Sequence, residues 1–383
     1  MGFEFATATE VVFGRGSFES LGARVRSLGR RALVVTGSKP GRTGVRERLE
    51  EAGVDVTPFR ITAEPTTAVA SEGAGRAREA DCAVVVGVGG GSVLDGAKAI
   101  SALLTNGGEP LDYLEVIGAG RKIERPSAPF VAVPTTSGTG SEVTRNAVLA
   151  SPEHRVKVSL RSVLMLPRVA LLDPALTRTV PPDVTASTGL DALTQVLEPF
   201  VSSRANPLTD VLCRDGLARA ARSLRRAYED GADLDAREDM ALVSLYGGMA
   251  LANAGLGAVH GFAGPLGGRL GAPHGALCAR LLPGVITANV GALRQRATGS
   301  PVLGRYAEVA RILTGRPDAA PEAAAAWVGD LAEALKIPGL AAHGLTPADI
   351  PAAVAQSREA SSMRGNPIEL ADPELHRILE DAL

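Results

Sequence analysis

The chain has 383 residues, 40 Lys and Arg against 42 Asp and Glu, and a formal net charge of −2. This balance gives no electrostatic reason to expect nucleic acid or another polyanion as a partner, and a 3% aromatic content argues against a stacking platform for single-stranded nucleic acid. The length exceeds the roughly 250–300 residues at which a single hydrophobic core stops growing, so we expect two domains.

The cysteines and the N-terminal sequence predict a cytoplasmic location. Cys82, Cys213 and Cys278 are odd in number and lack the spacing of a metal motif, so we expect three reduced core thiols. The opening MGFEFATATE has neither the basic nor the apolar region of a signal peptide. No apolar run approaches the roughly 20 residues that span a bilayer, so no membrane partner is expected.

Strand and helix signals alternate over the first part of the chain. Short apolar runs predict strands at 31–36, 54–61, 82–88 and 130–133, with helices at 45–52, 68–80 and 92–104. Apolar strands separated by helices indicate a parallel sheet that is covered on both faces. We therefore expect an α/β dinucleotide-binding domain over residues 1–181.

Beyond Pro181 and Pro182 the periodicity is helical, over 183–200, 207–228, 236–254 and further segments to residue 383. Pro207 and Pro273 also stand where helices would begin, as expected for proline in a first helical turn. We expect residues 182–383 to form an all-helical domain that carries the metal and substrate site.

The turn GVGGGS, residues 87–92, follows a predicted buried strand and opens a helix. Its glycines let a backbone approach a pyrophosphate, and the helix N-terminus offers free N–H groups to that anion. On the first helical turns, Asp95 suits a cap or a ligand hydroxyl, and Lys98 suits phosphate charge. The alternative is a tight turn with no ligand.

A second loop, PTTSGTGSEVTRNAV at residues 134–148, also follows a predicted strand. Thr135, Thr136 and Ser137 begin a run of hydroxyl donors that suits phosphate and ribose oxygens. The alternative is an ordinary Ser/Thr turn. Two such loops at the carboxyl ends of strands in one sheet are typical of ligand sites in open α/β folds.

The end of the first strand bears on the choice of cofactor. NAD sites often place an acid there to accept from the ribose 2′-hydroxyl. Here the position is Gly37, followed by Ser38, Lys39 and Arg42. A missing carboxylate with cations nearby favours the 2′-phosphate of NADP over NAD, unless these residues only form the turn.

The helical half carries a metal-type set. Asp191 and Gln195 are i, i+4 neighbours on one helix, while His260 and His274 lie in a glycine-rich segment further along. A carboxylate and two imidazoles suit Zn²⁺ or Fe²⁺ with positions open for substrate. A purely structural pair of histidines is the alternative.

Five motifs contribute to a family resemblance: GGGSVLDGAKA, PTTSGTGSEVT, LLDPALT, GLDALTQVLEPFVS, and VHGFAGPLGG followed by PHG. They resemble those of the iron-containing (group III) alcohol dehydrogenase family, in family order and over nearly the whole chain. The resemblance implies a dehydroquinate synthase-like architecture, with a dinucleotide domain followed by a helical metal domain. It implies reversible hydride transfer between a nicotinamide cofactor and an alcohol, aldehyde or ketone. It also implies a homodimer or a higher homo-oligomer.

The resemblance also assigns residues. Those implied to contact the pyrophosphate, ribose and nicotinamide side of the cofactor are Gly89, Gly90, Gly91, Ser92, Asp95, Thr135, Thr136 and Thr144. It implies a further cofactor contact for Lys157 and packing near the adenine for Leu176. A surface lysine and an ordinary core leucine are the alternatives at these two positions.

Two positions depart from the family. Its metal pattern is Asp, His, His, His, which Asp191, His260 and His274 match, but the second ligand is Gln195, whose amide oxygen binds a divalent ion more weakly. Gly264 stands where many members carry a further histidine. With a metal, the ion would polarise the carbonyl oxygen or lower the pKa of the alcohol. Without it, His260 or His274 would have to donate the proton or stabilise the alkoxide.

Three other functions stay open. A metal-independent enzyme resembling the maleylacetate reductases predicts cationic residues at the pocket, and the candidates are Arg145, Arg204, Arg269 and Arg280. A lyase of the dehydroquinate synthase type would use NAD without net turnover of the cofactor. A relative that has lost activity would bind dinucleotide without catalysis.

Overall fold

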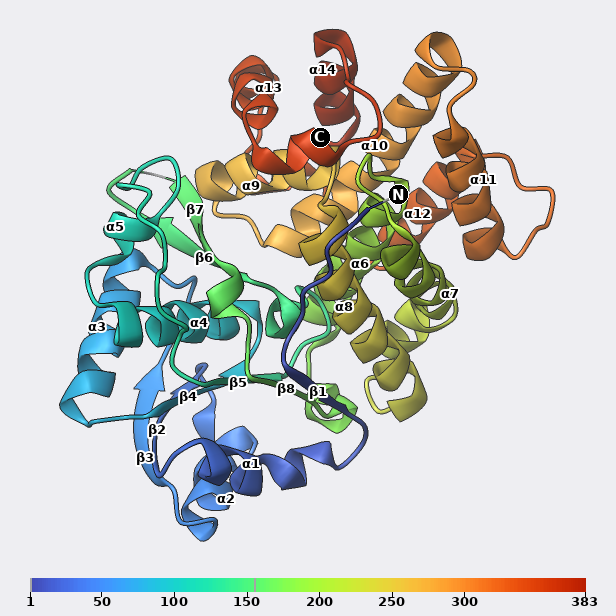
Figure 1. The fold of residues 1–383 in the computed structure, drawn as a ribbon. Helices are drawn as coiled ribbons and strands as arrows, with labels where there is room; N and C mark the ends of the chain where they lie inside the picture. The colour runs from blue at the N-terminus through green and yellow to red at the C-terminus, as the bar shows by residue number, and fades with distance from the viewer. Residues whose placement is uncertain (1, 155) are drawn as a thin grey trace. The chain divides into compact units, whose positions relative to one another are not determined.

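The computed structural model describes residues 2–154 and 156–383, and the chain forms two compact units. One consists of Ala6–Thr136 and Gly140–Thr179, and the other of Val180–Leu383 with residues 2–5 and Ser137–Thr139. Figure 1 shows a sheet in the first unit and helices in the second.

Six parallel strands form the sheet of the first unit, in the order β1-β8-β5-β4-β2-β3. The strands are β1 (Glu10–Phe13), β2 (Arg31–Thr36), β3 (Asp55–Arg60), β4 (Val84–Gly89), β5 (Phe130–Pro134) and β8 (Val169–Leu172). In the register of the sheet, Val34 of β2 lies between Pro58 of β3 and Val86 of β4. Pro58 is tolerated because β3 is an edge strand.

Helices cover both faces of this sheet, as Figure 1 shows. Alternate side chains of β2 enter opposite cores: Leu33 packs with residues of α3 and α4, and Val34 with residues of α1 and α2. The helices of this unit are α1 (Leu21–Leu28), α2 (Val45–Glu51), α3 (Thr67–Glu79), α4 (Gly91–Asn106) and α5 (Pro110–Tyr113).

Four strands were not predicted. β1 and β8 have four residues each, too short to show a pattern, and pair with each other at one side of the sheet. The strands β6 (Asn146–Ser151) and β7 (Val156–Arg161) pair antiparallel, and only the first three residues of β6 fall within the loop predicted over 134–148; no element was predicted for the rest. The strand β6 begins within the hydroxyl-rich segment, whose polar residues conceal the alternation.

The second unit is helical, as predicted. Its helices are α6 (Pro182–Val201), α7 (Pro207–Glu229), α8 (Leu234–Ala254), α9 (Ala258–Leu270), α10 (His274–Arg296), α11 (Pro301–Thr314), α12 (Glu322–Ala334), α13 (Ile350–Arg358) and α14 (Asp372–Asp381). Pro207 stands in the first turn of α7, and the Asn206 side chain accepts the Thr209 N–H at 3.2 Å.

The central helix α10 is long and apolar enough to cross a membrane, although no such run was expected. Within the protein, 67% of its apolar window is buried. Leu281, Leu282 and Ile286 belong to the main core of this unit. The apolar character of α10 is therefore that of a core helix.

Candidate functional site

The strand order places two predicted cofactor segments at one point of the sheet. From β2 the chain moves outward to β3 and then returns to the other side of β2 for β4, so the order reverses between β2 and β4. Gly37 follows β2, and Gly90 follows β4 as the N-cap of α4. Open α/β sheets bind ligands outside the carboxyl ends of strands at such a reversal.

The loop after β5 lies directly against the glycine turn. The Thr135 N–H donates to the Gly89 carbonyl at 2.9 Å. A Cβ added to Gly90 would lie 3.2 Å from Thr136 Oγ1. The glycine is therefore needed for the close approach of the two loops, and their N–H and hydroxyl groups gather at one edge of the sheet.

Lys98 of α4 makes four hydrogen bonds to the hydroxyl-rich loop and the start of β6. Its fully buried Nζ donates to the Ser141 carbonyl at 2.7 Å, Ser141 Oγ at 3.0 Å, Thr144 Oγ1 at 2.9 Å and the Asn146 carbonyl at 2.8 Å. Burial lowers the pKa of Lys98 to about 8, against the opposing effect of Asp95 and Glu142. Lys98 therefore ties α4 to the hydroxyl-rich loop, which differs from the predicted contact with phosphate.

Two carboxylates accompany Lys98. Asp95 accepts from Ser141 Oγ at 2.5 Å and from the Val148 N–H at 3.0 Å, so its oxygens are used within the chain. Burial raises the pKa of Glu142 to about 7, although a backbone hydrogen bond and Lys98 lower it, and Glu142 Oε1 has no hydrogen-bond partner among the described residues. The base of the two loops is thus a buried charge cluster.

Two further residues predicted for the cofactor, Lys157 and Leu176, lie in the same unit. Lys157 on β7 forms an ion pair with Glu64 at 3.5 Å. Leu176 packs against the core beneath α1 and α2, and its carbonyl accepts from Arg42 at 3.3 Å. Their contacts with a cofactor stay predictions, as do those of Ser38, Gly91, Ser92 and Ser137.

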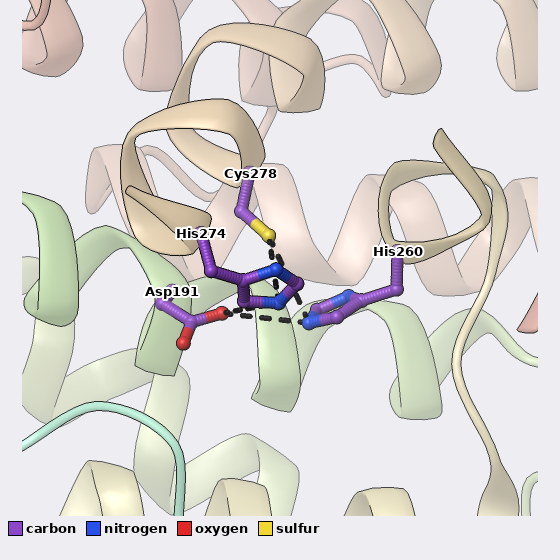
Figure 2. Close-up of side chains that lie close together, drawn as sticks. All are labelled: Asp191, His260, His274 and Cys278. Carbon is purple, nitrogen blue, oxygen red and sulfur yellow. Dashed lines mark hydrogen bonds and ion pairs between the residues drawn. The ribbon is translucent and has the colours of Figure 1, made fainter. Parts of the chain in front are cut away.

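Four side chains in the helical unit converge on one point (Figure 2). Asp191 lies in the middle of α6, His260 in the first turn of α9, and His274 and Cys278 one turn apart on α10. A Cβ on Gly275 would lie 2.2 Å from the Ser187 carbonyl, so this glycine permits the close approach of α10 to α6.

The distances within this cluster exceed those of good hydrogen bonds. Asp191 Oδ1 lies 3.4 Å from His260 Nε2 and 3.9 Å from His274 Nε2. Cys278 Sγ lies 3.6 Å from His274 Nε2 and 3.8 Å from His260 Nε2. One atom from each side chain lies within 4.8 Å of all the others.

Glu198 orients His260 from the opposite side. Its Oε2 lies 2.7 Å from His260 Nδ1, and its Oε1 accepts the Val259 N–H at 2.7 Å. Since the carboxylate can only accept, Nδ1 carries the proton and Nε2 faces Asp191. A second carboxylate that fixes the tautomer in this way is typical of histidines that bind metals.

The electrostatics of the cluster favour charged forms. Burial lowers the pKa of His260, but Cys278, Asp191 and Glu198 together raise it well above its usual value. Burial likewise lowers the pKa of His274, and Cys278 and Asp191 raise it to about 9. For Asp191, burial raises the pKa, but the two imidazoles lower it below the usual range.

The donor set fits a divalent metal. Asp191 Oδ1 and Gln195 Oε1 are buried and have no hydrogen-bond partner among the described residues. Unpaired oxygens in a protein interior are costly unless a cation or another donor meets them. A carboxylate and two imidazoles, oriented by Glu198, are the ligands that Zn²⁺ or Fe²⁺ takes from proteins.

Cys278 and Glu198 were not predicted as residues of this site. Cys278 was expected to be an ordinary core thiol, and it is indeed free and buried. Its spacing of four residues after His274 was the available signal, because i, i+4 residues share a helix face. Glu198 is seven residues after Asp191 and therefore lies two turns along the same face of α6.

Two of the arginines considered for a metal-independent pocket are engaged elsewhere. Arg269 forms an ion pair with Asp349, and Arg280 with Glu333. At Gly264, four residues after His260, an added Cβ would meet nothing within 4 Å. The position that lacks the family histidine is therefore open space beside α9.

Comparisons with known proteins cover nearly the whole chain. Residues 8–174 match the model of the iron-containing alcohol dehydrogenases, and residues 185–383 match the C-terminal model of that family. The chain is similar to a 4-hydroxybutyrate dehydrogenase from Cupriavidus necator, with 38% identity over 92% of each chain.

Solved structures resemble the whole fold. The crystal structure of a 1,3-propanediol oxidoreductase has a TM-score of 0.93 and 33% identity, with 100% of each chain covered. A sulfoacetaldehyde reductase from Bifidobacterium kashiwanohense, in complex with NAD⁺, has a TM-score of 0.87 and 28% identity, covering 100% of this chain and 99% of that one.

Proposed function

Because this chain belongs to the iron-containing alcohol dehydrogenase family, we propose that it interconverts a small alcohol and its aldehyde or ketone with NADP as the preferred cofactor. Membership confirms the resemblance carried by the motifs. It makes the protein an alcohol dehydrogenase or aldehyde reductase, in which hydride moves to or from a nicotinamide with the assistance of a divalent metal.

We assign the metal to Asp191, His260 and His274. The observation that carries this assignment is the buried Asp191 Oδ1, which has no hydrogen-bond partner in the described part of the chain and faces two imidazole nitrogens. Gln195 joins the set as a weak oxygen ligand, because its Oε1 is also buried and has no hydrogen-bond partner among the residues that the structure describes. A bound divalent ion supplies Lewis-acid polarisation of the substrate oxygen.

The protein's own groups prepare this chemistry. Glu198 keeps the proton on His260 Nδ1, so that Nε2 remains available on the side of Asp191. His260 and Asp191 are buried, whereas the His274 side chain is 38% exposed. His274 is therefore the member of the cluster that is open to solvent, and the other two are shielded from water.

We assign the nicotinamide cofactor to the loops at the carboxyl ends of β2, β4 and β5. Gly37, Gly90 and Thr136 represent these three loops. The preference for NADP rests on Gly37, which offers no carboxylate to a ribose hydroxyl, and on the neighbouring Lys39 and Arg42. Initial rates with NADPH and NADH test it, and a higher kcat/KM with NADH would contradict it.

The names of similar proteins define the first substrates to assay. They act on 4-hydroxybutyrate and 1,3-propanediol as alcohols and on sulfoacetaldehyde as an aldehyde. We propose a substrate of this size for the present chain, and the open space beside Gly264 supports a substrate that extends toward α9.

Metal removal tests the proposed function. Protein stripped with a chelator is expected to lose at least tenfold in the rate of cofactor oxidation with an aldehyde, and Zn²⁺ or Fe²⁺ should restore it. Full activity without metal would support the metal-independent alternative. The same assay also tests for a lyase or an inactive relative. In either case the absorbance of the reduced nicotinamide would show no net change.

We further propose a cytoplasmic homo-oligomer. Leu208 and Val211 on α7 are exposed large apolar side chains three residues apart, and such neighbours suit a contact between subunits. Light scattering of the purified protein tests this, and a monomeric mass at working concentrations would contradict it.

A further inference from the structure

Cys278 completes the cluster around Asp191 from a side that the other ligands leave open (Figure 2). Its side chain is fully buried, one turn after His274 on α10. Its sulfur lies within 4 Å of the Nε2 atoms of both histidines. This placement differs from that of Cys213, a core thiol on α7 outside the four-residue cluster.

The spacing of the four atoms approaches that of ligands around one ion. Two ligand atoms each about 2.0 Å from a tetrahedral Zn²⁺ lie about 3.3 Å apart, and a sulfur at about 2.3 Å lies about 3.5 Å from a nitrogen ligand. Here Asp191 Oδ1 lies 3.4 Å from His260 Nε2 and 3.9 Å from His274 Nε2. Cys278 Sγ lies 3.6 Å from His274 Nε2 and 3.8 Å from His260 Nε2, so the four atoms stand slightly wider apart than ligands around a bound ion.

We propose that the Cys278 thiolate is a metal ligand, and that the centre consequently prefers zinc to ferrous iron. This inference rests on the metal centre proposed above and names its fourth strong ligand. A thiolate binds a borderline-soft ion far better than the neutral amide oxygen of Gln195 does. Gln195 also donates a hydrogen bond to Asp191, which is a positioning role.

Binding has a defined proton balance. The Cys278 S–H bond breaks, the sulfur electron pair forms the bond to the ion, and the proton leaves to solvent. His260 and His274 bind through Nε2, so the proton that each charged imidazole carries there is also displaced to solvent.

X-ray absorption of the zinc-loaded full-length protein tests the ligand directly. The native protein is expected to show a zinc–sulfur shell at about 2.3 Å. Cys278→Ser should lose this shell and bind zinc at least tenfold more weakly. Cys213→Ser makes the same change at another buried thiol, so it should keep the shell and the native affinity.

The outcomes separate the two proposals. One zinc per chain without a sulfur shell in the native protein would overturn the role of Cys278 and leave the metal centre standing. No zinc binding after loading would overturn both. A shell that persists in Cys278→Ser would also overturn the inference. If that variant fails to fold, the presence or absence of the zinc–sulfur shell in the native protein still tests the role of Cys278.

Metal competition tests the preference. Native apoprotein given equal Zn²⁺ and Fe²⁺ under anaerobic conditions is expected to bind mainly zinc, as metal analysis after gel filtration would show. Cys278→Ser should take a larger share of iron than the native protein does. Predominant iron in the native protein would overturn the zinc preference.

Discussion

The Glu198 carboxylate binds His260 Nδ1 at 2.7 Å, and the opposite ring nitrogen faces Asp191. One residue thus sets the orientation and the tautomer of the buried imidazole. The same carboxylate also accepts the Val259 N–H, which fixes it against the start of α9. Glu198 therefore acts on the metal centre through His260, without a place in the four-residue cluster.

Glu198→Gln is expected to weaken metal binding about 10–100-fold, the usual effect of removing such an outer partner. The amide can present an N–H to Nδ1, which favours the wrong tautomer of His260. Titration calorimetry with Zn²⁺ measures the affinity. Glu308→Gln is the matched control, because Glu308 forms an ion pair with Arg214 and neither residue belongs to the metal cluster. Equal affinities for both variants would contradict the role of Glu198.

Lys98→Met is expected to lower the free energy of unfolding by roughly 2–4 kcal/mol, because buried acceptors and carboxylates lose their donor. The same variant should raise the KM for the nicotinamide cofactor, since Lys98 ties the loop at Ser141 to α4. Urea unfolding and initial rates measure the two effects. Lys122→Met, at an exposed position, is the control. A stability change equal to that of the control would contradict this structural role.

Glu142 predicts a pH dependence of stability. Burial raises its pKa from 4.5 to about 7 in the folded protein. Between pH 4.5 and pH 7 the carboxyl group is therefore protonated in the folded state and ionised in the unfolded state. This contribution is fully present below pH 4.5 and is lost as the pH rises through 7, by up to about 3 kcal/mol.

Glu142→Gln should remove that decline. Urea unfolding at several pH values between 4.5 and 8 measures it, with Glu72→Gln at an exposed position as the control. Native protein and Glu142→Gln with parallel pH profiles would show that Glu142 does not titrate in this range.

Gly90→Ala is expected to raise the KM for the cofactor about tenfold, equivalent to about 1.4 kcal/mol. The added Cβ would lie 3.2 Å from Thr136 Oγ1 and push the two loops apart. Gly75→Ala, where a Cβ meets nothing within 4 Å, is the control. An unchanged KM in Gly90→Ala would place the cofactor away from this turn.

Local patterns were sufficient to predict the centre of the sheet and the helical half. The strand at Val84–Gly89 is buried along its whole length, and its apolar run is visible in the sequence. The four-residue strands β1 and β8 lack such a pattern, because their position depends on pairing with each other across the whole domain.

The same limit applies to the site. Asp191, His260 and His274 could be recognised from their residue types and motifs. Cys278 and Glu198 were not assigned: helical spacing places each on the same face as a predicted ligand, but their contacts with the histidines arise from the packing of α6, α9 and α10. Lys98 was misassigned because its sequence position does not reveal that its side chain turns inward.

Anomalous diffraction from crystals of the zinc-loaded protein with bound nicotinamide tests the central claim most directly. One peak is expected at about 2.0–2.2 Å from Asp191 Oδ1 and from the Nε2 atoms of His260 and His274, and about 2.3 Å from Cys278 Sγ. The proposed metal centre would be contradicted if the preparation is active and the crystals contain bound cofactor but show no anomalous peak among these four atoms.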